Sequence, residues 1–339
     1  MTKIAIIGAN GMVGNTMLSL LTSDYIVPKS ELFLFGNSAA GKVVSAGGRD
    51  YTVLALTKEN LEKIRPDFAL FAAGGDVSRE FAPMVAELGG ITIDNSSYFR
   101  MDKNVPLVVT EVNPNVLSKI KGGTIVANPN CSTIQAVVAL KPLLDEFGIV
   151  RIIYSTYQAV SGAGKGGIDD LEKGMADANY HKQFAHPIFN NLIPQIDAFM
   201  EDGYTKEEAK MINETRKIFG QENLAITCTA VRVPVRNCHS VSINVELEKP
   251  ATLQGVRDAL KRAEKDGRGV RVVDAMSENL YPMPMLVDGK DETLVGRIRL
   301  DPSRPNCVNL FCVADNVRKG AATNAVQILM HLMKGENNQ

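Results

Sequence analysis

The residues best suited to covalent chemistry lie in the stretch Asn128-Pro129-Asn130-Cys131-Ser132-Thr133. A strand-like apolar run (124–127) precedes it, and a helix-like run with apolar spacing (134–147) follows it. We therefore expect Cys131 at or just before the first helical turn, where free N–H groups and the helix dipole favour a thiolate. A small capping residue is the structural alternative, but cysteine caps helices poorly and Asn130 already suits that position. We interpret Cys131 as a nucleophile.

A histidine later in the chain has the chemistry to assist such a nucleophile. His239 stands at the entrance of a predicted strand (240–247) and shares the parity of its apolar residues. Arg232 lies seven residues earlier, near the end of another predicted strand (225–233). A loop-facing strand entrance is a common place for catalytic side chains, and a satisfied core histidine is the structural alternative.

Two further elements bring polar side chains that could serve a site. A predicted strand over 151–160 carries, on one face, Tyr154, Thr156 and Gln158. The glycine-rich loop 161–167 follows and serves either as a hinge or as a close approach for a cofactor. Residues 176–204 contain two prolines and are predicted to be irregular.

A helix beginning at Thr205 carries a charged pair. Thr205 and Glu208 form a capping box, and Glu214 and Lys217 are three residues apart, so they lie on one face. A solvated helix ion pair is the structural alternative for this pair.

The N-terminus has the pattern of a dinucleotide site. A strand over 3–7 is followed by the turn Gly8-Ala9-Asn10-Gly11-Met12-Val13-Gly14 and a helix through Leu21. This GxxGxxG order allows a tight turn and puts phosphate oxygens at a helix N-terminus. The second strand (31–35) ends in a loop with Asn37, Ser38 and Ala39, without the acidic residue typical of NAD sites. That loop and the nearby Lys42 favour a 2′-phosphate, and hence NADP; a plain polar loop is the alternative.

Strands and helices then alternate, which predicts a doubly wound parallel sheet. Strands are predicted over 67–71, 90–94, 107–109 and 124–127, with a helix over 78–88. Gly74 and Gly75 follow one strand end, where a nucleotide would lie against the sheet. Arg100 follows the next strand end and could hold an anion, or be a solvated surface residue.

Composition excludes several classes of partner. The net charge is -1, and no long basic run exists, which disfavours nucleic acid and anionic membranes. No apolar stretch is long enough to span a membrane. The five cysteines form no framework and predict a reducing cytoplasm. The four histidines lack metal-ligand spacing, so we predict no metal site.

With these motifs in this order, the chain resembles the aspartate-β-semialdehyde dehydrogenase family over essentially its whole length. The residues that carry the resemblance are the opening glycine turn, Asn130-Cys131-Ser132-Thr133, Gln158 with Ser161-Gly162-Ala163-Gly164, Asn213-Glu214 with Lys217, and Arg232 with His239-Ser240. The resemblance implies NADPH-dependent reduction of L-aspartyl 4-phosphate to L-aspartate 4-semialdehyde in the synthesis of lysine, threonine, methionine and diaminopimelate. It also implies a homodimer or a dimer of dimers.

The resemblance assigns roles by position. Cys131 would be the acyl-thioester nucleophile and His239 the general acid/base, with Gln158 and Asn130 beside them. The substrate ligands would be Arg100 and Lys217 for phosphate, Arg232 for the α-carboxylate and Glu214 for the α-ammonium. The cofactor contacts would be Gly8, Asn10, Gly11, Met12, Val13, Gly14, Asn37, Ser38, Ala39, Gly74, Ser161, Gly162 and Asn316. The loop at 37–40 departs from the family in lacking the arginine that NADP-preferring members often carry.

The predicted architecture is α/β. An N-terminal Rossmann-type domain would span 1–130 plus 317–339, to which the C-terminal helix returns, and an α+β catalytic and dimerisation domain would span 131–316. Two alternatives remain for the function. One is an N-acetyl-glutamyl-phosphate reductase, whose substrate has no free ammonium for Glu214. The other is a non-catalytic NADP-binding module that uses Cys131 only as an oxidisable thiol.

Overall fold

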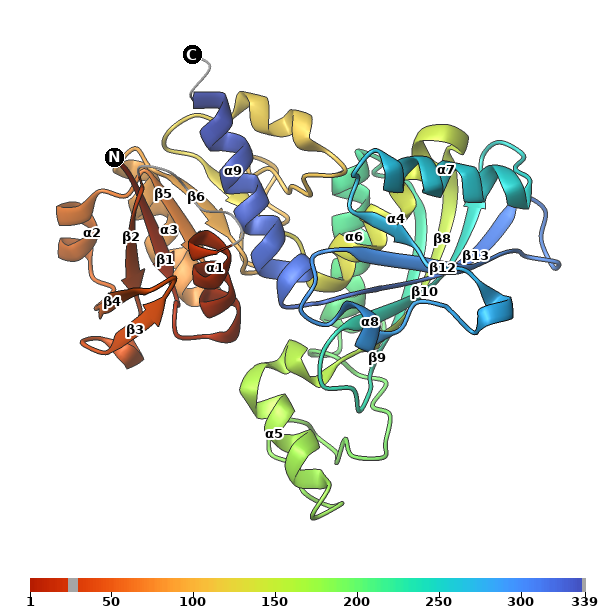
Figure 1. The fold of residues 1–339 in the computed structure, drawn as a ribbon, viewed down its shortest axis with the longest axis horizontal. Coiled ribbons are helices and arrows are strands. Elements are labelled where there is room, and N and C mark those ends of the chain that lie inside the picture. The colour runs from red at the N-terminus through yellow and green to blue at the C-terminus, as the bar shows by residue number, and fades with distance from the viewer. Residues whose placement is uncertain (24–29, 337–339) are drawn as a thin grey trace. The chain divides into compact units, whose positions relative to one another are not determined.

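The computed structural model describes residues 1–23 and 30–336, which divide into two compact units (Figure 1). Unit 1 comprises residues 1–130 together with the chain from Ala321 onward, and unit 2 comprises Cys131–Gly320. Residues 24–29 and 337–339, which belong to the N-terminal domain predicted from the sequence, lie outside the described residues.

Unit 1 is built on a seven-stranded sheet flanked by helices. Its elements are β1 (Thr2–Ile7), α1 (Met12–Thr22), β2 (Ser30–Phe35), β3 (Val43–Ala46), β4 (Arg49–Leu54), α2 (Lys58–Ile64), β5 (Phe68–Phe71), α3 (Gly75–Glu87), β6 (Ile91–Asp94), β7 (Ile125–Ala127) and α9 (Asn324–Glu336). The strand order is β3-β4-β2-β1-β5-β6-β7, and all pairs are parallel except β3 with β4.

Helices cover both faces of this sheet because side chains alternate along its strands. Ile4 and Ile6 of β1 pack in one cluster with α1 and α9, whereas Ala5 and Ile7 pack in another with α2 and α3. Val326 and Leu329 of α9 are fully buried in the first cluster. The doubly wound sheet and the return of the C-terminal helix to it, both predicted from the sequence, are therefore confirmed.

Two parts of unit 1 differ from the pattern read in the sequence. The apolar run 107–109 is not a strand, since Leu107 forms only an isolated bridge with Ala127. The Asn113 side chain instead accepts from the Val109 N–H at 2.9 Å and donates to the Leu107 carbonyl at 2.9 Å. The hairpin β3–β4 was not predicted, although Gly47-Gly48, both with positive φ, is a recognised two-residue hairpin turn.

Unit 2 is built on a six-stranded mixed sheet. Its elements are α4 (Cys131–Phe147), β8 (Ile149–Gln158), α5 (Gly164–Gly174), α6 (Lys206–Phe219), β9 (Ala225–Arg232), β10 (His239–Leu247), α7 (Leu253–Lys265), β11 (Val270–Val272), α8 (Pro284–Val287), β12 (Thr293–Leu300) and β13 (Cys307–Ala314). The strand order is β11-β12-β13-β10-β8-β9. The fully described stretch between α5 and α6 has no helix or strand, as predicted, and Figure 1 shows α5 projecting away from the sheet of its own unit.

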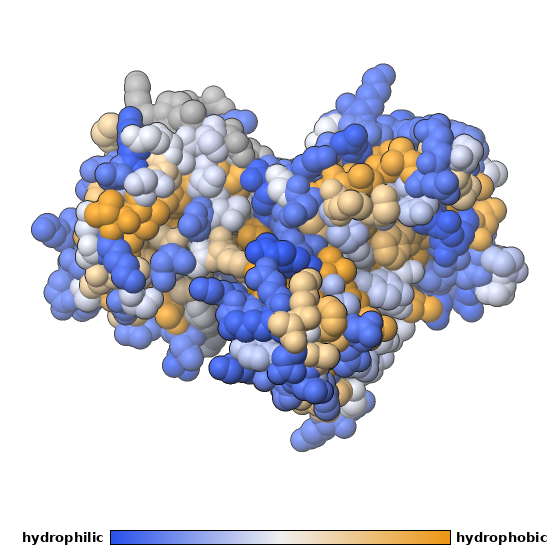
Figure 2. All heavy atoms as spheres, turned by 60° about the horizontal axis from the view of Figure 1, so that its bottom comes forward, coloured by the Kyte–Doolittle hydropathy of each residue, from blue (hydrophilic) through white to orange (hydrophobic). Residues whose placement is uncertain are grey.

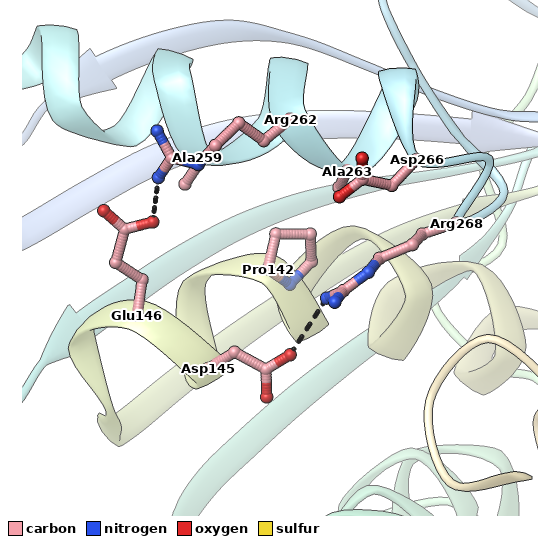
Figure 3. A pocket seen from close by; sticks show the side chains of 8 residues that line it. All are labelled: Pro142, Asp145, Glu146, Ala259, Arg262, Ala263, Asp266 and Arg268. Carbon is pink, nitrogen blue, oxygen red and sulfur yellow. Dashed lines mark hydrogen bonds and ion pairs between the residues drawn. The ribbon is translucent and has the colours of Figure 1, made fainter.

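Helices α4 and α7 of unit 2 pack together, and their surface carries a pocket of about 310 Å³ (Figure 3). Arg268 pairs with Asp145 at 3.2 Å, and Arg262 pairs with Glu146. None of the site residues predicted from the sequence lines this pocket. We interpret these two ion pairs as structural links between α4 and the C-terminal part of α7 with the residues that follow it.

The surface drawn in Figure 2 has separate hydrophobic patches between polar side chains. Within the ranges that the structure describes, no helix combines the length and the apolar character needed to cross a membrane.

Candidate active site

Cys131 is the first residue of α4, as the sequence predicted. All five cysteines lie in the described ranges; four are buried, and Cys131 is partly exposed. Burial raises the pKa of the thiols of Cys228, Cys238 and Cys312. The backbone at Gly320 packs close to Cys131, since a Cβ on Gly320 would lie 2.9 Å from the Cys131 Cβ. Cys131 is thus the accessible thiol, and it starts a helix whose N-terminus favours negative charge.

His239 is the first residue of β10 and is fully buried. The backbone N–H of Ala159 donates to its Nδ1 at 3.0 Å, so the neutral ring carries its proton on Nε2. Among the described residues, Nε2 has no hydrogen-bond partner. Burial, reinforced by Arg232, holds the pKa of His239 well below its usual 6.5. The ring is therefore neutral, with one N–H to offer.

Arg232 ends β9 and is the register partner of Gln158 at the end of β8. Its Nη1 donates to the Ala159 carbonyl at 2.7 Å, and its guanidinium lies 5.6 Å from the ring centre of Phe184. Burial lowers the pKa of Arg232, while Glu207 and then Cys131 favour its charged form. The single residue Ala159 thus holds His239 through its N–H and Arg232 through its carbonyl.

Gly162 lies against both of these side chains. A Cβ on Gly162 would be 2.9 Å from Arg232 Nη1 and 3.1 Å from His239 Nε2. Only glycine lets the backbone approach these two groups so closely. The resemblance implies a cofactor contact at Gly162, and this close packing is a second reason for glycine at the position.

Gln158 is buried and belongs to a polar chain that the sequence analysis did not detect. Its Nε2 donates to Glu207 Oε1 at 3.1 Å, and its Oε1 accepts from Thr156 Oγ1 at 3.0 Å. Lys210 donates to the other Glu207 oxygen at 3.2 Å and to Asp197 at 2.8 Å. The sequence shows only that Glu207 lies in the first turn after the capping Thr205; its burial is visible in the structure alone.

The charged pair predicted on one helix lies on α6. Glu214 is 1% exposed and Lys217 is partly exposed. Helix α6 packs on β9, the strand that ends at Arg232. The capping box predicted at Thr205 is confirmed, with Glu208 as its acidic member. A carboxylate as buried as that of Glu214 is uncommon on a solvated helix face.

Ser161 and Asn316 lie together in unit 2, although 155 residues separate them. Asn316 Nδ2 donates to Ser161 Oγ at 3.0 Å, and its Oδ1 accepts from the Cys238 N–H at 2.9 Å. Ser161 Oγ also donates to Asn237 Oδ1 at 2.9 Å. Asn316 is therefore held rigidly beside the glycine-rich loop.

The irregular segment 176–204 is attached to the same region. The buried Asp170 carboxylate accepts from three successive N–H groups, those of Lys182, Gln183 and Phe184, at 2.8–3.1 Å. Ile193 exchanges two backbone hydrogen bonds with Arg232, at 2.8 and 3.1 Å. The segment thus supports Arg232 both through its backbone and through the Phe184 ring.

In unit 1, the glycine turn after β1 packs with no room for side chains. Gly8 has φ +86, and a Cβ on it would lie 2.7 Å from the Ala72 carbonyl oxygen; a Cβ on Gly14 would lie 2.2 Å from the Gly8 oxygen. Helix α1 begins at Met12 after Gly11, which offers no side chain as a cap, and continues through Val13. Its first N–H groups are therefore suited to an anion.

The loop after β2 lies against this turn. Asn10 Nδ2 donates to Ser38 Oγ at 3.1 Å, while Asn37 Oδ1 accepts from the Leu56 N–H at 2.8 Å. Ala39 is buried in the core of unit 1, so its methyl group faces the protein. Gly74 precedes α3, and a Cβ there would have open space.

Arg100 is also in unit 1 and is buried. Its Nε donates to the Asn128 carbonyl at 2.9 Å and its Nη2 to the Asn95 carbonyl at 2.9 Å. Asn128 Nδ2 in turn donates to Asn95 Oδ1 at 2.7 Å. Asn130, also buried, is the last residue of unit 1 before Cys131. Arg100 and Asn130 thus belong to one unit, and Cys131, Gln158, Arg232 and His239 to the other.

One cluster in the described ranges has the spacing of metal ligands: Cys238, Asp288 and Asp315 lie with their ligand atoms within 4.8 Å of one another. Asp315 accepts from four groups, the N–H groups of Gly289, Val317 and Arg318 and the amide of Asn237. Burial, and then the two carboxylates, raise the pKa of Cys238, so the thiol keeps its proton. We interpret the cluster as a structural tie beside Asn316.

Comparison with known proteins identifies two matching families. Residues 3–120 match the family described as Semialdehyde dehydrogenase, NAD binding domain, and residues 140–319 match Semialdehyde dehydrogenase, dimerisation domain. An aspartate-semialdehyde dehydrogenase of Aquifex aeolicus is 50% identical over 342 residues, covering 98% of each chain.

Solved structures agree with this. Aspartate semialdehyde dehydrogenase II of Vibrio cholerae, complexed with ASA, has a TM-score of 0.92 and 43% identity over 98% of each chain. The enzyme of Candida albicans with NADP has a TM-score of 0.78 and 26% identity over 99% of each chain.

Proposed function

Because the chain belongs to the aspartate-semialdehyde dehydrogenase family, we propose that it reduces L-aspartyl 4-phosphate to L-aspartate 4-semialdehyde with NADPH, releasing phosphate through a thioester on Cys131. The observation that carries this proposal is the arrangement around Ala159 and Gly162, which holds His239 and Arg232 side by side. Cys131 also favours the charged form of Arg232. A nucleophile, a hydrogen-bond donor and an anion-binding group thus occur in one unit.

The Cys131 thiolate attacks the acyl carbon, forming a C–S bond, and the C–O bond to phosphate breaks. The first N–H groups of α4 are suited to hold the oxyanion that forms. After reduction of the thioester, the Nε2–H of His239 donates a hydrogen bond to the new alkoxide, which collapses to the aldehyde as the C–S bond breaks and the Cys131 thiolate leaves. A neutral, buried imidazole with its proton on Nε2 suits this hydrogen bond, so His239 stabilises the oxyanion without losing its own proton.

The charges of the proposed ligands complement those of the substrate. Arg232 pairs with the α-carboxylate and Glu214 with the α-ammonium, while Arg100 and Lys217 hold the phosphate. Two anionic groups and one cation thus meet three cations and one anion. The carboxylate of Glu214 is complementary to an α-ammonium group, whereas an N-acetylated substrate has no charge at that position.

We infer NADP as the cofactor, and the residues of unit 1 fit it. The turn around Gly8 and Gly14 leaves no space for a Cβ, which lets the backbone and the first turn of α1 approach a pyrophosphate. Asn10, Asn37 and Ser38 supply polar groups in unit 1. The resemblance also implies cofactor contacts for Ser161 and Asn316, which are hydrogen-bonded to each other within unit 2. When bound, the cofactor supplies the hydride. The NADP complex of the Candida albicans relative supports this choice.

We also infer that the product feeds the synthesis of lysine, threonine, methionine and diaminopimelate. The match to a dimerisation domain over 140–319 supports a homodimer or a dimer of dimers. All five cysteines are free thiols, which supports the reducing cytoplasm as the compartment.

The test is the oxidative reaction, followed by NADPH absorbance from aspartate semialdehyde with and without phosphate. We expect turnover that requires phosphate and disappears in Cys131→Ala. Turnover without phosphate would refute the thioester phosphorolysis. Turnover confined to N-acetyl-glutamate semialdehyde would refute the assignment of aspartate semialdehyde as the substrate.

A further inference from the structure

Glu207 has no part in the roles assigned so far, yet it is a buried carboxylate in contact with a proposed catalytic side chain. It lies in the first turn of α6, is 4% exposed, and accepts from Gln158 Nε2 at 3.1 Å. Burying a carboxylate is costly unless charged or hydrogen-bonded partners offset the lost hydration. Lys210 supplies such a partner at 3.2 Å, and Asp197 holds Lys210 in turn.

The contact decides which way the Gln158 amide faces. The other neighbour of this amide is the hydroxyl of Thr156, 3.0 Å from Oε1. A hydroxyl can donate or accept, so Thr156 tolerates either orientation of the amide. A carboxylate only accepts, so Glu207 requires the NH₂ end of Gln158 to face it. Lys210, which only donates, contacts the other oxygen of Glu207 at 3.2 Å.

The same carboxylate acts on Arg232, the register partner of Gln158 across β8 and β9. Burial lowers the pKa of Arg232, and Glu207 opposes this more strongly than Cys131 does. One buried carboxylate therefore acts on Gln158 and on Arg232, which the proposed function places beside the nucleophile and at the substrate α-carboxylate, respectively.

We propose that Glu207 is a positioning residue, which fixes the amide of Gln158 in the orientation needed at Cys131. The inference rests on the proposed function, since the role of Gln158 belongs to that reaction. It predicts that the loss of Glu207 lowers kcat through Gln158, and that it leaves the binding of phosphate unchanged.

The neighbouring Glu208 offers a matched control. It is also buried, but its carboxylate accepts from the N–H groups of Thr205 and Ala230, at 2.6 and 2.9 Å, which are structural contacts. We therefore compare Glu207→Gln with Glu208→Gln. A glutamine at 207 cannot accept from Gln158 and from Lys210 together, because one end of its amide is a donor.

We expect Glu207→Gln to lower kcat about 10- to 100-fold, with the KM for phosphate within about twofold of wild type. Glu208→Gln should lower the Tm and leave kcat per folded enzyme unchanged. In the background of Gln158→Ala, Glu207→Gln should have little further effect on kcat, because its target is gone.

Three results would overturn the inference: unchanged kcat in Glu207→Gln, the same change in both glutamine variants, or full additivity with Gln158→Ala. If Glu207→Gln is not recovered folded, Glu207→Asp makes the test, because it keeps the charge but withdraws the oxygens from Gln158. Wild-type enzyme and Cys131→Ala are assayed alongside. An inactive wild type would refute the proposed function and this inference with it, whereas an active wild type with an equally active Glu207→Gln refutes this inference alone.

Discussion

Substitution of Gly162 by alanine is the most direct test of the arrangement around His239 and Arg232. The new Cβ would lie 2.9 Å from Arg232 Nη1 and 3.1 Å from His239 Nε2, where ordinary contacts begin at 3.4 Å. The φ of Gly162 is outside the left-handed region, so the variant tests crowding and not backbone strain.

The expected loss of activity follows from the hydrogen bonds that hold Arg232 and His239 in place. Arg232 is fixed to the Ala159 carbonyl at 2.7 Å, and His239 to the Ala159 N–H at 3.0 Å. Relief of the clash stretches at least one of these buried hydrogen bonds, which costs about 1–3 kcal/mol. If that cost falls on the transition state, kcat/KM falls about 5- to 160-fold.

The assay measures kcat and KM for aspartate semialdehyde together with the Tm. Gly255→Ala in α7 is the control, because its new Cβ would meet only Thr252 Oγ1 at 3.3 Å and Phe147 Cζ at 3.7 Å. It should keep wild-type kinetics, and its Tm should stay or rise, since alanine favours a helix. A Gly162→Ala enzyme with kcat/KM within about twofold of wild type would refute the reasoning.

Three further predictions concern protonation, support and thiol access. Because the pKa of His239 is lowered in the folded state, the unfolded state binds an extra proton below the unfolded pKa; stability contributed by the neutral ring falls as pH drops below about 6.5. Urea midpoints measured from pH 8 to pH 5 should therefore decline less steeply in His239→Gln than in wild type, and equal slopes would contradict this. Asp170→Asn should raise the KM for aspartate semialdehyde and speed protease cleavage within 176–204, because an amide cannot accept from all three N–H groups; unchanged KM would show that the segment does not support Arg232. Iodoacetamide should label Cys131 before the four buried thiols, as read by peptide mass spectrometry; earlier labelling of Cys312 would be inconsistent with its burial.

Local sequence patterns were sufficient for most of the elements. Alternating and helical spacing predicted the strands and helices, and Thr205 with Glu208 marked the start of α6 correctly. The prediction of a strand at 107–109 was wrong because hydrophobicity alone does not show which groups take the backbone hydrogen bonds; the Asn113 side chain takes those of the Val109 N–H and the Leu107 carbonyl. The β3–β4 hairpin was missed because its strands are largely exposed and therefore lack a clear apolar face; of their residues only Val53 is buried.

What the sequence determined by itself is the set of local motifs: the glycine turn after β1, a cysteine at the start of a helix, and the order of the strands and helices along the chain. Each depends on residues a few positions apart, whose spacing sets their geometry. The tertiary structure decided which distant groups meet. Ala159 holds His239 from 80 residues away, and Glu207 orients Gln158 across 49. Such contacts depend on the register of β8, β9 and β10 and on the packing of α6, which the pairing of strands and the burial of side chains establish only in the folded chain.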